Sequence, residues 1–332
     1  MPQSISILGA GSWGTALALQ AARNGCDTML WGHNPQHISQ MQQARENQRY
    51  LPGFQFPTNL HITDNLQQAV DFSQLILLVV PSHAFKTTLT TIQPFLSPLS
   101  QIAWASKGFD SETGALMSQV SLSILGSNIN TAVISGPTFA KEVAAGLPTA
   151  LTIASNSEQF ANDLTSRFHN QYFRTYTSQD MIGVQVGGAC KNVLAIAAGI
   201  ADGLGLGANT RAALITRGLN EIMRLGIKLG GQADTFMGLT GLGDLILTCT
   251  DNQSRNRRFG LALGQGQSRE QALTEIAQEV EGIGAAREAY QLSKHHQVEM
   301  PITEQVYKVL FENLDPKLAV QNLLARDQKP EN

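Results

Sequence analysis

The sequence of 332 residues predicts an α/β protein in which a mostly parallel β-sheet domain precedes an all-helical domain. Two observations lead to this fold class. Through the first half, short apolar runs bounded by turn residues alternate with helical patterns, as in strands joined by crossover helices. From about Gln185 onward, long helical stretches with few clustered β-branched residues take over. Because a chain of this length exceeds the size of a single core, we expect two domains, residues 1–184 and residues 185–332.

The candidate strands lie mainly in the first domain. Strands of a parallel sheet are buried on both faces, so they read as continuous apolar runs. Such runs occur at residues 4–8, 27–30, 75–80, 101–106 and 131–135. A further pair of strands is expected before the domain boundary, at residues 149–155 and 173–178. In the second half, the clearest helical patterns are residues 209–230 and 301–314.

Composition and charge argue against several classes of protein. The sequence is 42% hydrophobic and 15% charged, and it enters a candidate strand directly after the amino terminus. It contains no run of about 18 apolar residues, so we expect no transmembrane span, no secretory signal and a cytoplasmic location. A net charge of -3 argues against nucleic acid as the main partner. The cysteines and histidines show no metal-ligand spacing, so no metal site is expected.

A glycine motif follows the first candidate strand. Gly9, Gly11 and Gly14 form G-x-G-x-x-G before a helical stretch that ends at Asn24 and Gly25. In Rossmann-type domains these glycines permit a tight turn, close approach of the backbone to a pyrophosphate, and packing of the helix on the strand. The N–H groups of the helix N-terminus then face the phosphates. The motif in this setting predicts a dinucleotide site, and a glycine turn without a ligand is the alternative.

The end of the second candidate strand carries no acidic residue. In such domains an acid there binds the adenosine ribose hydroxyls and disfavours a 2′-phosphate. Here the strand ends in Trp31, Gly32, His33 and Asn34. This favours NADP, or use of both NADP and NAD, with His33 as a candidate phosphate ligand. An ordinary histidine in a surface loop is the alternative for His33.

Lys191 stands out in the second domain. It is the only charged residue between Asp180 and Asp202, and its small and apolar neighbours predict a buried helix. Burying an ammonium costs about 3 kcal/mol or more unless the group is paired. Lys191 therefore either has a structural ion-pair partner or takes part in chemistry.

Further polar residues lie where open α/β sheets bind ligands, at the carboxyl ends of strands. Lys107 follows one candidate strand, and Gly136 and Thr138 follow the next. Asp244 is a lone acid in a glycine-rich apolar stretch, and a basic segment comes after it. We interpret the combination as an anion pocket, with a solvated basic loop as the alternative for the last segment, which consists of Ser254, Arg255, Asn256, Arg257 and Arg258.

These blocks resemble bacterial NAD(P)-dependent glycerol-3-phosphate dehydrogenases, in the same order along the chain. The resemblance extends from residue 4 to about residue 320 and implies reversible hydride transfer between NADH or NADPH and dihydroxyacetone phosphate. The product is sn-glycerol 3-phosphate, the precursor of glycerophospholipids, and the resemblance also suggests a homodimer. The matching segments are GAGSWGTALA, VPSHAF, SKGF, SGPTFAKEVA, GGACKNVLAIAAGIADGLGLGANTRAALITRGLNEI, TGLGDLILTCT and SRNRRFG.

The resemblance also implies roles for individual residues. Lys191 becomes the general acid/base, and substrate binding falls to Lys107, Gly136, Thr138, Lys191, Asn192, Asp244, Ser254, Arg255 and Asn256. Cofactor binding falls to Gly9, Gly11, Ser12, Trp13, Gly14, His33, Lys107, Ala140, Arg255, Glu279 and Glu281. Two positions depart from the pattern: Gln185 replaces the usual Glu, and Glu279 stands where an aliphatic residue is common.

The chemistry of ketone reduction suits this set. Negative charge develops on the carbonyl oxygen, and an ammonium can both stabilise and protonate it. Burial and a second ammonium at Lys107 would lower the pKa of Lys191, while Asp244 would orient the amine and limit that shift. The planar fork of Arg255 matches a phosphate.

Two other classes share parts of the pattern. Hydroxyacid dehydrogenases and ketopantoate-type reductases have the same architecture, but their substrates carry a carboxylate. An activity that depends on a phosphate group in the substrate would therefore distinguish a glycerol-3-phosphate dehydrogenase from them. A nicotinamide-binding sensor would have lost the catalytic set. Here all four of its central residues are present, namely Lys107, Lys191, Asp244 and Arg255.

Overall fold

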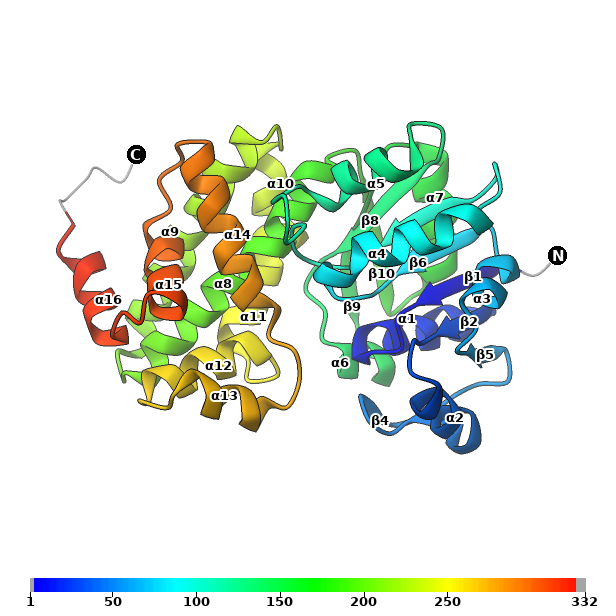
Figure 1. Cartoon of the computed structure of the whole chain (residues 1–332), viewed down its shortest axis with the longest axis horizontal. Coiled ribbons are helices and arrows are strands. Elements are labelled where there is room, and N and C mark those ends of the chain that lie inside the picture. Colours follow the sequence, from blue (N-terminus) through cyan, green and yellow to red (C-terminus); the bar gives the residue numbers. More distant parts are fainter. Residues whose placement is uncertain (1–2, 327–332) are drawn as a thin grey trace. The chain divides into compact units, whose positions relative to one another are not determined.

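The computed structural model describes residues 3–326 and divides the chain into two compact units (Figure 1). The first unit contains the described residues up to Asp110 together with Ala115–Gln185. The second contains Ser111–Gly114 and the described residues from Val186 onward. Each unit has its own secondary-structure class, so they are described separately.

The first unit is built on an eight-stranded sheet with the order β10-β9-β8-β7-β6-β1-β2-β5. Neighbouring strands are parallel except for β8 and β9, which are antiparallel. This confirms the predicted mostly parallel sheet. The strands are β1 (Ser4–Leu8), β2 (Asp27–Trp31), β5 (Leu60–Thr63), β6 (Leu75–Leu78), β7 (Gln101–Trp104), β8 (Thr131–Ser135), β9 (Thr149–Ser155) and β10 (Phe173–Ser178).

Three strands were not predicted from the sequence. One is β5, the edge strand beside β2, whose four residues alternate between apolar and polar side chains. The others form a small antiparallel hairpin, β3 (Glu46–Asn47) and β4 (Leu51–Gln55). Short strands carry too few residues for a period to show, so the pattern of hydrophobic residues does not distinguish them from loops.

Two hydrophobic cores cover opposite faces of the sheet. Successive side chains of a strand alternate between the faces, so Ile7 belongs to one core and Leu8 to the other. Figure 1 shows the helices of this unit lying on both faces. The first core includes side chains of α1 (Ser12–Arg23), α2 (Pro35–Ala44), α6 (Ala140–Ala145) and α7 (Glu158–Phe168). The second includes those of α3 (Leu66–Phe72), α4 (Ser82–Ile92) and α5 (Met117–Leu125).

The second unit is helical throughout its described residues, which confirms the all-helical prediction. A five-residue π-helical turn, Leu239–Gly243, leads into α11. The helices are α8 (Met181–Gly203, in this unit from Val186 onward), α9 (Gly207–Lys228), α10 (Ala233–Met237), α11 (Asp244–Thr250), α12 (Arg255–Gly264), α13 (Arg269–Ile276), α14 (Glu281–His295), α15 (Pro301–Phe311) and α16 (Pro316–Leu324).

Helix α8 is the buried axis of this unit. Although the sequence has no uninterrupted apolar run of spanning length, α8 is long and apolar enough to cross a membrane by length and composition. However, 89% of the relevant window is buried inside the protein. A helix that is apolar on all sides is expected in a protein core as well as in a membrane, so α8 is weak evidence for a membrane span.

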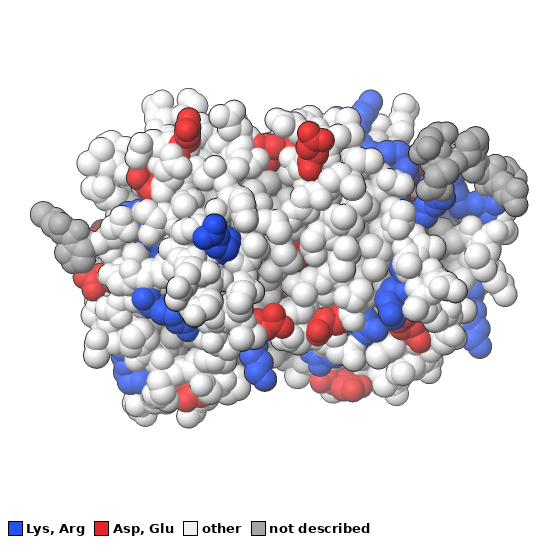
Figure 2. Space-filling model, turned by 180° about the vertical axis from the view of Figure 1, so that it is seen from behind, with Lys and Arg blue, Asp and Glu red and all other residues white. Residues whose placement is uncertain are grey.

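Charged side chains are sparse on the face of the molecule in Figure 2. Acidic and basic groups occur there in small clusters separated by wide uncharged areas. This agrees with the low content of charged residues, 15% of the chain, and with the small net charge of -3.

Candidate functional site

The glycine loop between β1 and α1 has the geometry that a dinucleotide needs. Gly9 has φ +132°, and a Cβ there would lie 2.4 Å from the carbonyl oxygen of Val79. A Cβ on Gly14 would lie 1.8 Å from the carbonyl oxygen of Gly9. Both positions therefore require glycine for the protein's own packing. At Gly11 a Cβ would meet nothing within 4 Å, so open space adjoins the backbone where a pyrophosphate would approach.

Helix α1 begins in this loop without a side-chain cap. Its N-cap residue is Gly11, which has no side chain to accept a hydrogen bond from the first turn. The Ser12 hydroxyl donates to the carbonyl oxygen of Tyr50 at 2.8 Å, and Trp13 packs against the first core with its indole N–H buried and without a hydrogen-bond partner. An uncapped helix N-terminus is suited to an anionic group.

A buried asparagine that the sequence analysis missed holds this loop. Asn47 is fully buried, and its Nδ2 donates to the carbonyl oxygen of Ala10 at 3.0 Å and to Thr15 Oγ1 at 2.8 Å. Its Oδ1 accepts from the backbone N–H of Tyr50 at 3.1 Å and lies 3.0 Å from His37 Nε2. No sequence motif marks Asn47, since its partners lie between 3 and 37 residues away.

The carboxyl end of β2 lies next to the glycine loop. The N–H of Gly9 donates to the carbonyl oxygen of Trp31 at 2.9 Å. His33 follows and is exposed, and Asn34 caps α2 by accepting from the N–H of His37 at 3.0 Å. The position that usually carries a ribose-binding acid therefore has a solvent-accessible histidine.

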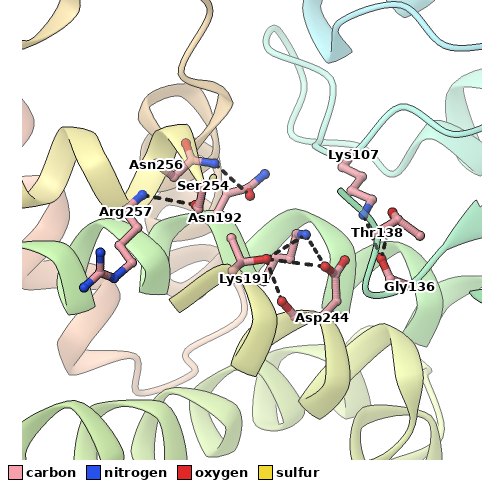
Figure 3. A network of polar contacts seen from close by, with 10 residues as sticks. Lys107, Gly136, Thr138, Lys191, Asn192, Asp244, Ser254, Asn256 and Arg257 are labelled. Atoms are coloured by element: carbon pink, nitrogen blue, oxygen red, sulfur yellow. Dashed lines mark hydrogen bonds and ion pairs between the residues drawn. The ribbon is translucent and has the colours of Figure 1, made fainter. Parts of the chain in front are cut away.

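Three further candidate residues meet at adjacent strand ends of the same sheet. The Nζ of Lys107, which follows β7, donates to the carbonyl oxygen of Gly136, which follows β8, at 3.3 Å. The Thr138 hydroxyl donates to the same oxygen at 3.2 Å, as Figure 3 shows. Ala140, the first residue of α6, comes two residues after Thr138. These groups occupy the edge of the sheet at which open α/β folds bind ligands.

In the second unit, Lys191 is paired. Its side chain is only 8% exposed, and its Nζ donates to Oδ1 of Asp244, which is completely buried. Thr248 Oγ1 accepts from the same Nζ at 3.0 Å and donates to the carbonyl oxygen of Asp244 at 2.6 Å. Thr248 was missed from the sequence, although it lies one helical turn after Asp244 on α11. The three side chains form a compact polar cluster among apolar neighbours.

A glycine on α8 allows this cluster to form. Gly187 lies one turn before Lys191, and a Cβ there would be 2.6 Å from the carbonyl oxygen of Thr240. The π-helical turn thus packs directly on the backbone of α8, and α11 starts at Asp244 immediately after it. Gly187 is therefore a packing requirement that allows the segment before Asp244 to approach α8 closely.

Asn192, the residue after Lys191, begins a series of hydrogen bonds between three helices. Asn192 Oδ1 accepts from Asn256 Nδ2 at 2.9 Å, and Asn256 Oδ1 accepts from the N–H of Gly282 at 2.9 Å. These bonds connect α8, α12 and α14. They also link Asn192, the residue after Lys191, to the start of α14, where Glu281 is the first residue.

The arginines of the basic segment have different surroundings. Ser254 caps α12, and Arg255 donates to Gln278 Oε1 at 3.4 Å. Arg257 is buried and pairs with Asp202 at 2.5 Å, so it holds α12 on α8. Arg258 is exposed. The sequence grouped these arginines together, but the burial of Arg257 against an acid 55 residues away identifies it as structural.

Gln185 and Glu279, the two residues that depart from the family pattern, lie outside the Lys191 cluster. Gln185 accepts from the N–H of Ser118 at 2.9 Å and donates to the carbonyl oxygen of Met181 at 2.7 Å, so it joins the start of α8 to α5. Glu279 is exposed in the segment before α14. Among the described residues, no group of three or more His, Cys, Asp or Glu side chains could hold a metal ion.

Taken separately, the two units offer complementary chemistry. The first has a glycine loop and helix N-terminus suited to a dinucleotide, and a lysine at a strand end. The second has a buried ammonium held by a carboxylate and a hydroxyl, which can exchange a proton, and an arginine that can bind an anion.

Comparisons with known proteins agree over nearly the whole chain. The family model described as NAD-dependent glycerol-3-phosphate dehydrogenase N-terminus matches residues 4–161, and the corresponding C-terminus model matches residues 180–321. The glycerol-3-phosphate dehydrogenase (NAD(P)+) of Colwellia psychrerythraea is 56% identical over 326 residues, covering 98% of each chain. The same-named protein of Methylococcus capsulatus is 55% identical and covers 100% of this chain and 99% of its own.

Solved structures give the same result. The crystal structure of glycerol-3-phosphate dehydrogenase from Coxiella burnetii superposes with a TM-score of 0.95 and 50% identity, covering 98% of this chain and 99% of that one. A ketopantoate reductase from Ralstonia eutropha has a TM-score of 0.61 and 16% identity, and it covers 96% of this chain and 100% of that one. The second likeness shows the fold alone.

Proposed function

The chain belongs to the NAD-dependent glycerol-3-phosphate dehydrogenase family, and from this premise we propose that it interconverts dihydroxyacetone phosphate and sn-glycerol 3-phosphate with NAD or NADP as cofactor. The observation that carries the proposal is the buried cluster of Lys191, Asp244 and Thr248 in a chain that also has an open glycine loop. The first unit acts as the dinucleotide-binding domain, and the second as the substrate and catalytic domain.

The cofactor is held by the glycine loop and its surroundings. The open space at Gly11 and the uncapped start of α1 fit a pyrophosphate. When bound, the nicotinamide cofactor supplies hydride to the ketone carbon or accepts it from the alcohol. The residues proposed to contact the cofactor are Gly9, Gly11, Ser12, Trp13, Gly14, His33, Lys107, Ala140, Arg255, Glu279 and Glu281.

Lys191 acts as the general acid/base. In the reduction its Nζ donates a proton to the substrate oxygen, and in the oxidation it accepts that proton. Asp244 holds the amine in place by an ion pair, and Thr248 accepts from a second of the three N–H groups of the ammonium. Because both partners are buried, the amine cannot turn away to water without leaving Asp244 unpaired, which costs several kcal/mol.

The substrate phosphate provides binding energy away from the reacting carbon. A guanidinium such as that of Arg255 binds phosphate through parallel N–H groups, and this positions the ketone for reaction. Hydride and proton are added to one carbonyl group, the hydride to its carbon and the proton to its oxygen. The substrate residues proposed are Lys107, Gly136, Thr138, Lys191, Asn192, Asp244, Ser254, Arg255 and Asn256.

We extend the proposal to the cellular setting. The product serves glycerophospholipid synthesis, the enzyme is cytoplasmic, and it works as a homodimer. Size-exclusion chromatography with light scattering on the purified chain tests the last point, and a mass of one chain, 35.8 kDa, would contradict it.

The decisive experiment measures oxidation of NADPH and NADH with dihydroxyacetone phosphate for the wild type and for Lys191→Arg. Arginine keeps the positive charge beside Asp244 but cannot give up its proton at working pH. We expect turnover of the wild type and a loss of at least about 100-fold in kcat for the variant. Lys294→Ala, at an exposed lysine of the same unit, is the control and should keep full activity.

Two outcomes would overturn the proposal. If the wild type binds NADPH but does not oxidise it with dihydroxyacetone phosphate, the substrate assignment fails. If Lys191→Arg folds normally by circular dichroism and retains wild-type kcat, the amine is not the acid/base. Ketopantoate, a ketone with a carboxylate in place of the phosphate, serves as the negative control substrate.

A further inference from the structure

The β3–β4 hairpin is tied to the glycine loop at three points. Asn47 donates to the carbonyl oxygen of Ala10 and to Thr15 Oγ1, and Ser12 Oγ donates to the carbonyl oxygen of Tyr50. The anchoring residues Asn47 and Tyr50 enclose only two residues of the turn. The turn is therefore fixed beside the N-terminus of α1.

Arg49 is one of the two enclosed residues. It is exposed, and its guanidinium carbon lies 4.9 Å from the ring centroid of Tyr50. The Tyr50 ring in turn packs edge-on against His37, with the ring centroids 5.1 Å apart. Since a guanidinium stacked on an aromatic ring keeps its N–H groups in the plane, it can present them to an anion while the stack limits its motion.

His33 also lies near this aromatic pair. It precedes His37 by four residues, at the carboxyl end of β2. Burial is the main cause that lowers the pKa of His37, and the positive charges of Arg49 and His33 lower this pKa further. Arg49 and His33 thus both lie close enough to His37 to act electrostatically on its ring.

Two acids lie in the segments around Arg49 and His33: Glu46 in the hairpin, and the exposed Asp64 after β5, the strand beside β2. Residues 31–34 contain none, and the acid of the hairpin is engaged elsewhere. Glu46 accepts from the N–H of Gly53 at 2.8 Å and from Gln55 Nε2 at 2.9 Å. The end of β2, where adenosine ribose binds in Rossmann-type domains, therefore carries an imidazole and has the Arg49 guanidinium nearby, with no acid on the strand end itself.

We propose that Arg49, together with His33, binds the 2′-phosphate of NADP and makes this chain select NADP over NAD. The inference rests on the proposed function only in taking a nicotinamide dinucleotide as the cofactor. Arg49 supplies a planar, always charged group that matches phosphate oxygens. The hairpin holds it in place through Asn47 and Tyr50.

Calorimetric titration with two fragments tests this selectivity without any turnover. Adenosine 2′,5′-bisphosphate carries the 2′-phosphate, and adenosine 5′-monophosphate lacks it. We expect the wild type to bind the bisphosphate at least about tenfold more tightly, and Arg49→Ala to lose most of this preference while binding the monophosphate unchanged. Arg174→Ala removes an exposed arginine from β10, at the other edge of the sheet, and should behave as the wild type.

Kinetics give an independent readout. For Arg49→Ala we expect a KM for NADPH raised about tenfold with kcat and the KM for NADH unchanged, and for Arg49→Lys an intermediate KM. Equal binding of both fragments by the wild type, or unchanged preference in Arg49→Ala, would overturn the inference. If the bisphosphate preference depends on Arg49 but dihydroxyacetone phosphate is not reduced, the proposed function fails and this inference stands.

Discussion

The glycine loop of the first unit and the Lys191 cluster of the second use different groups to stabilise charge. The loop uses backbone groups at a helix N-terminus and buries no ionised side chain in its Asn47 network. The cluster buries an ammonium and a carboxylate next to each other. The partial charges of backbone dipoles need no counter-ion, whereas each buried ion is stable only while the other is present. Substitutions should therefore disturb the second unit mainly through unpaired charge, and the first mainly through shape.

The largest effect is expected at Asp244. Asp244→Ala leaves the Lys191 ammonium buried without its counter-ion, which should lower the free energy of unfolding by about 3–5 kcal/mol. The double variant with Lys191→Met should recover most of that loss, because neither charge remains. Urea denaturation measures both, and Asp234→Ala, at an exposed acid on α10, is the control. Equal losses in the single and the double variant would show that the unpaired ammonium is not the cause of the loss.

The second prediction concerns another buried acid of the helical unit. Glu221 accepts from the N–H groups of Ile302 and Thr303 at 2.6 and 3.1 Å, and burial raises its pKa from 4.5 to about 7. The folded chain therefore holds a proton that the unfolded chain releases between these values. The free energy of unfolding should fall as pH rises through this window, by up to about 3 kcal/mol.

Chemical denaturation at several pH values between 4.5 and 7.5 measures this dependence. Glu221→Gln carries no titratable group at this position, so its stability should change less over the same range. A slope in Glu221→Gln as steep as in the wild type would assign the pH dependence to other groups.

In the first unit, a matched pair of glycine substitutions separates packing from binding. Gly14→Ala places a Cβ against a backbone oxygen and should lower stability by about 1–3 kcal/mol, with loss of cofactor binding. Gly11→Ala meets no protein atom and should change stability by less than about 0.5 kcal/mol. It should nevertheless weaken NADP binding, measured by calorimetry, because the methyl group fills the space of the pyrophosphate. Unchanged NADP affinity in Gly11→Ala would place the pyrophosphate elsewhere.

The smallest effect is expected at Thr248. Thr248→Val keeps the shape but removes the hydroxyl that accepts from Lys191, which should cost about 1 kcal/mol of stability and lower kcat several-fold. Thr216→Val is the matched control, since its hydroxyl also donates to the carbonyl oxygen four residues earlier but is exposed on α9. If both variants retain wild-type kcat, Thr248 has no part in holding the amine.

Sequence patterns located most of the sheet because parallel strands are continuous apolar runs. They missed β5 and the β3–β4 hairpin, whose residues are few and mixed in polarity. The hairpin matters most, because it carries Asn47 and adjoins Arg49. A buried asparagine has no distinguishing neighbours in the sequence, so its role depends on contacts that only the folded chain provides.

The sequence by itself determined the fold class, the glycine loop and the presence of an isolated lysine in an apolar helix. These follow from local composition and spacing, which the chain carries whether or not it is folded. The tertiary structure joined Lys191 to Asp244, the acid already expected to orient the amine, and it alone decided that Thr248 joins them and that Arg257 pairs with Asp202. Such choices depend on helix packing across about fifty residues of chain, where close approach at a single glycine determines which side chains meet.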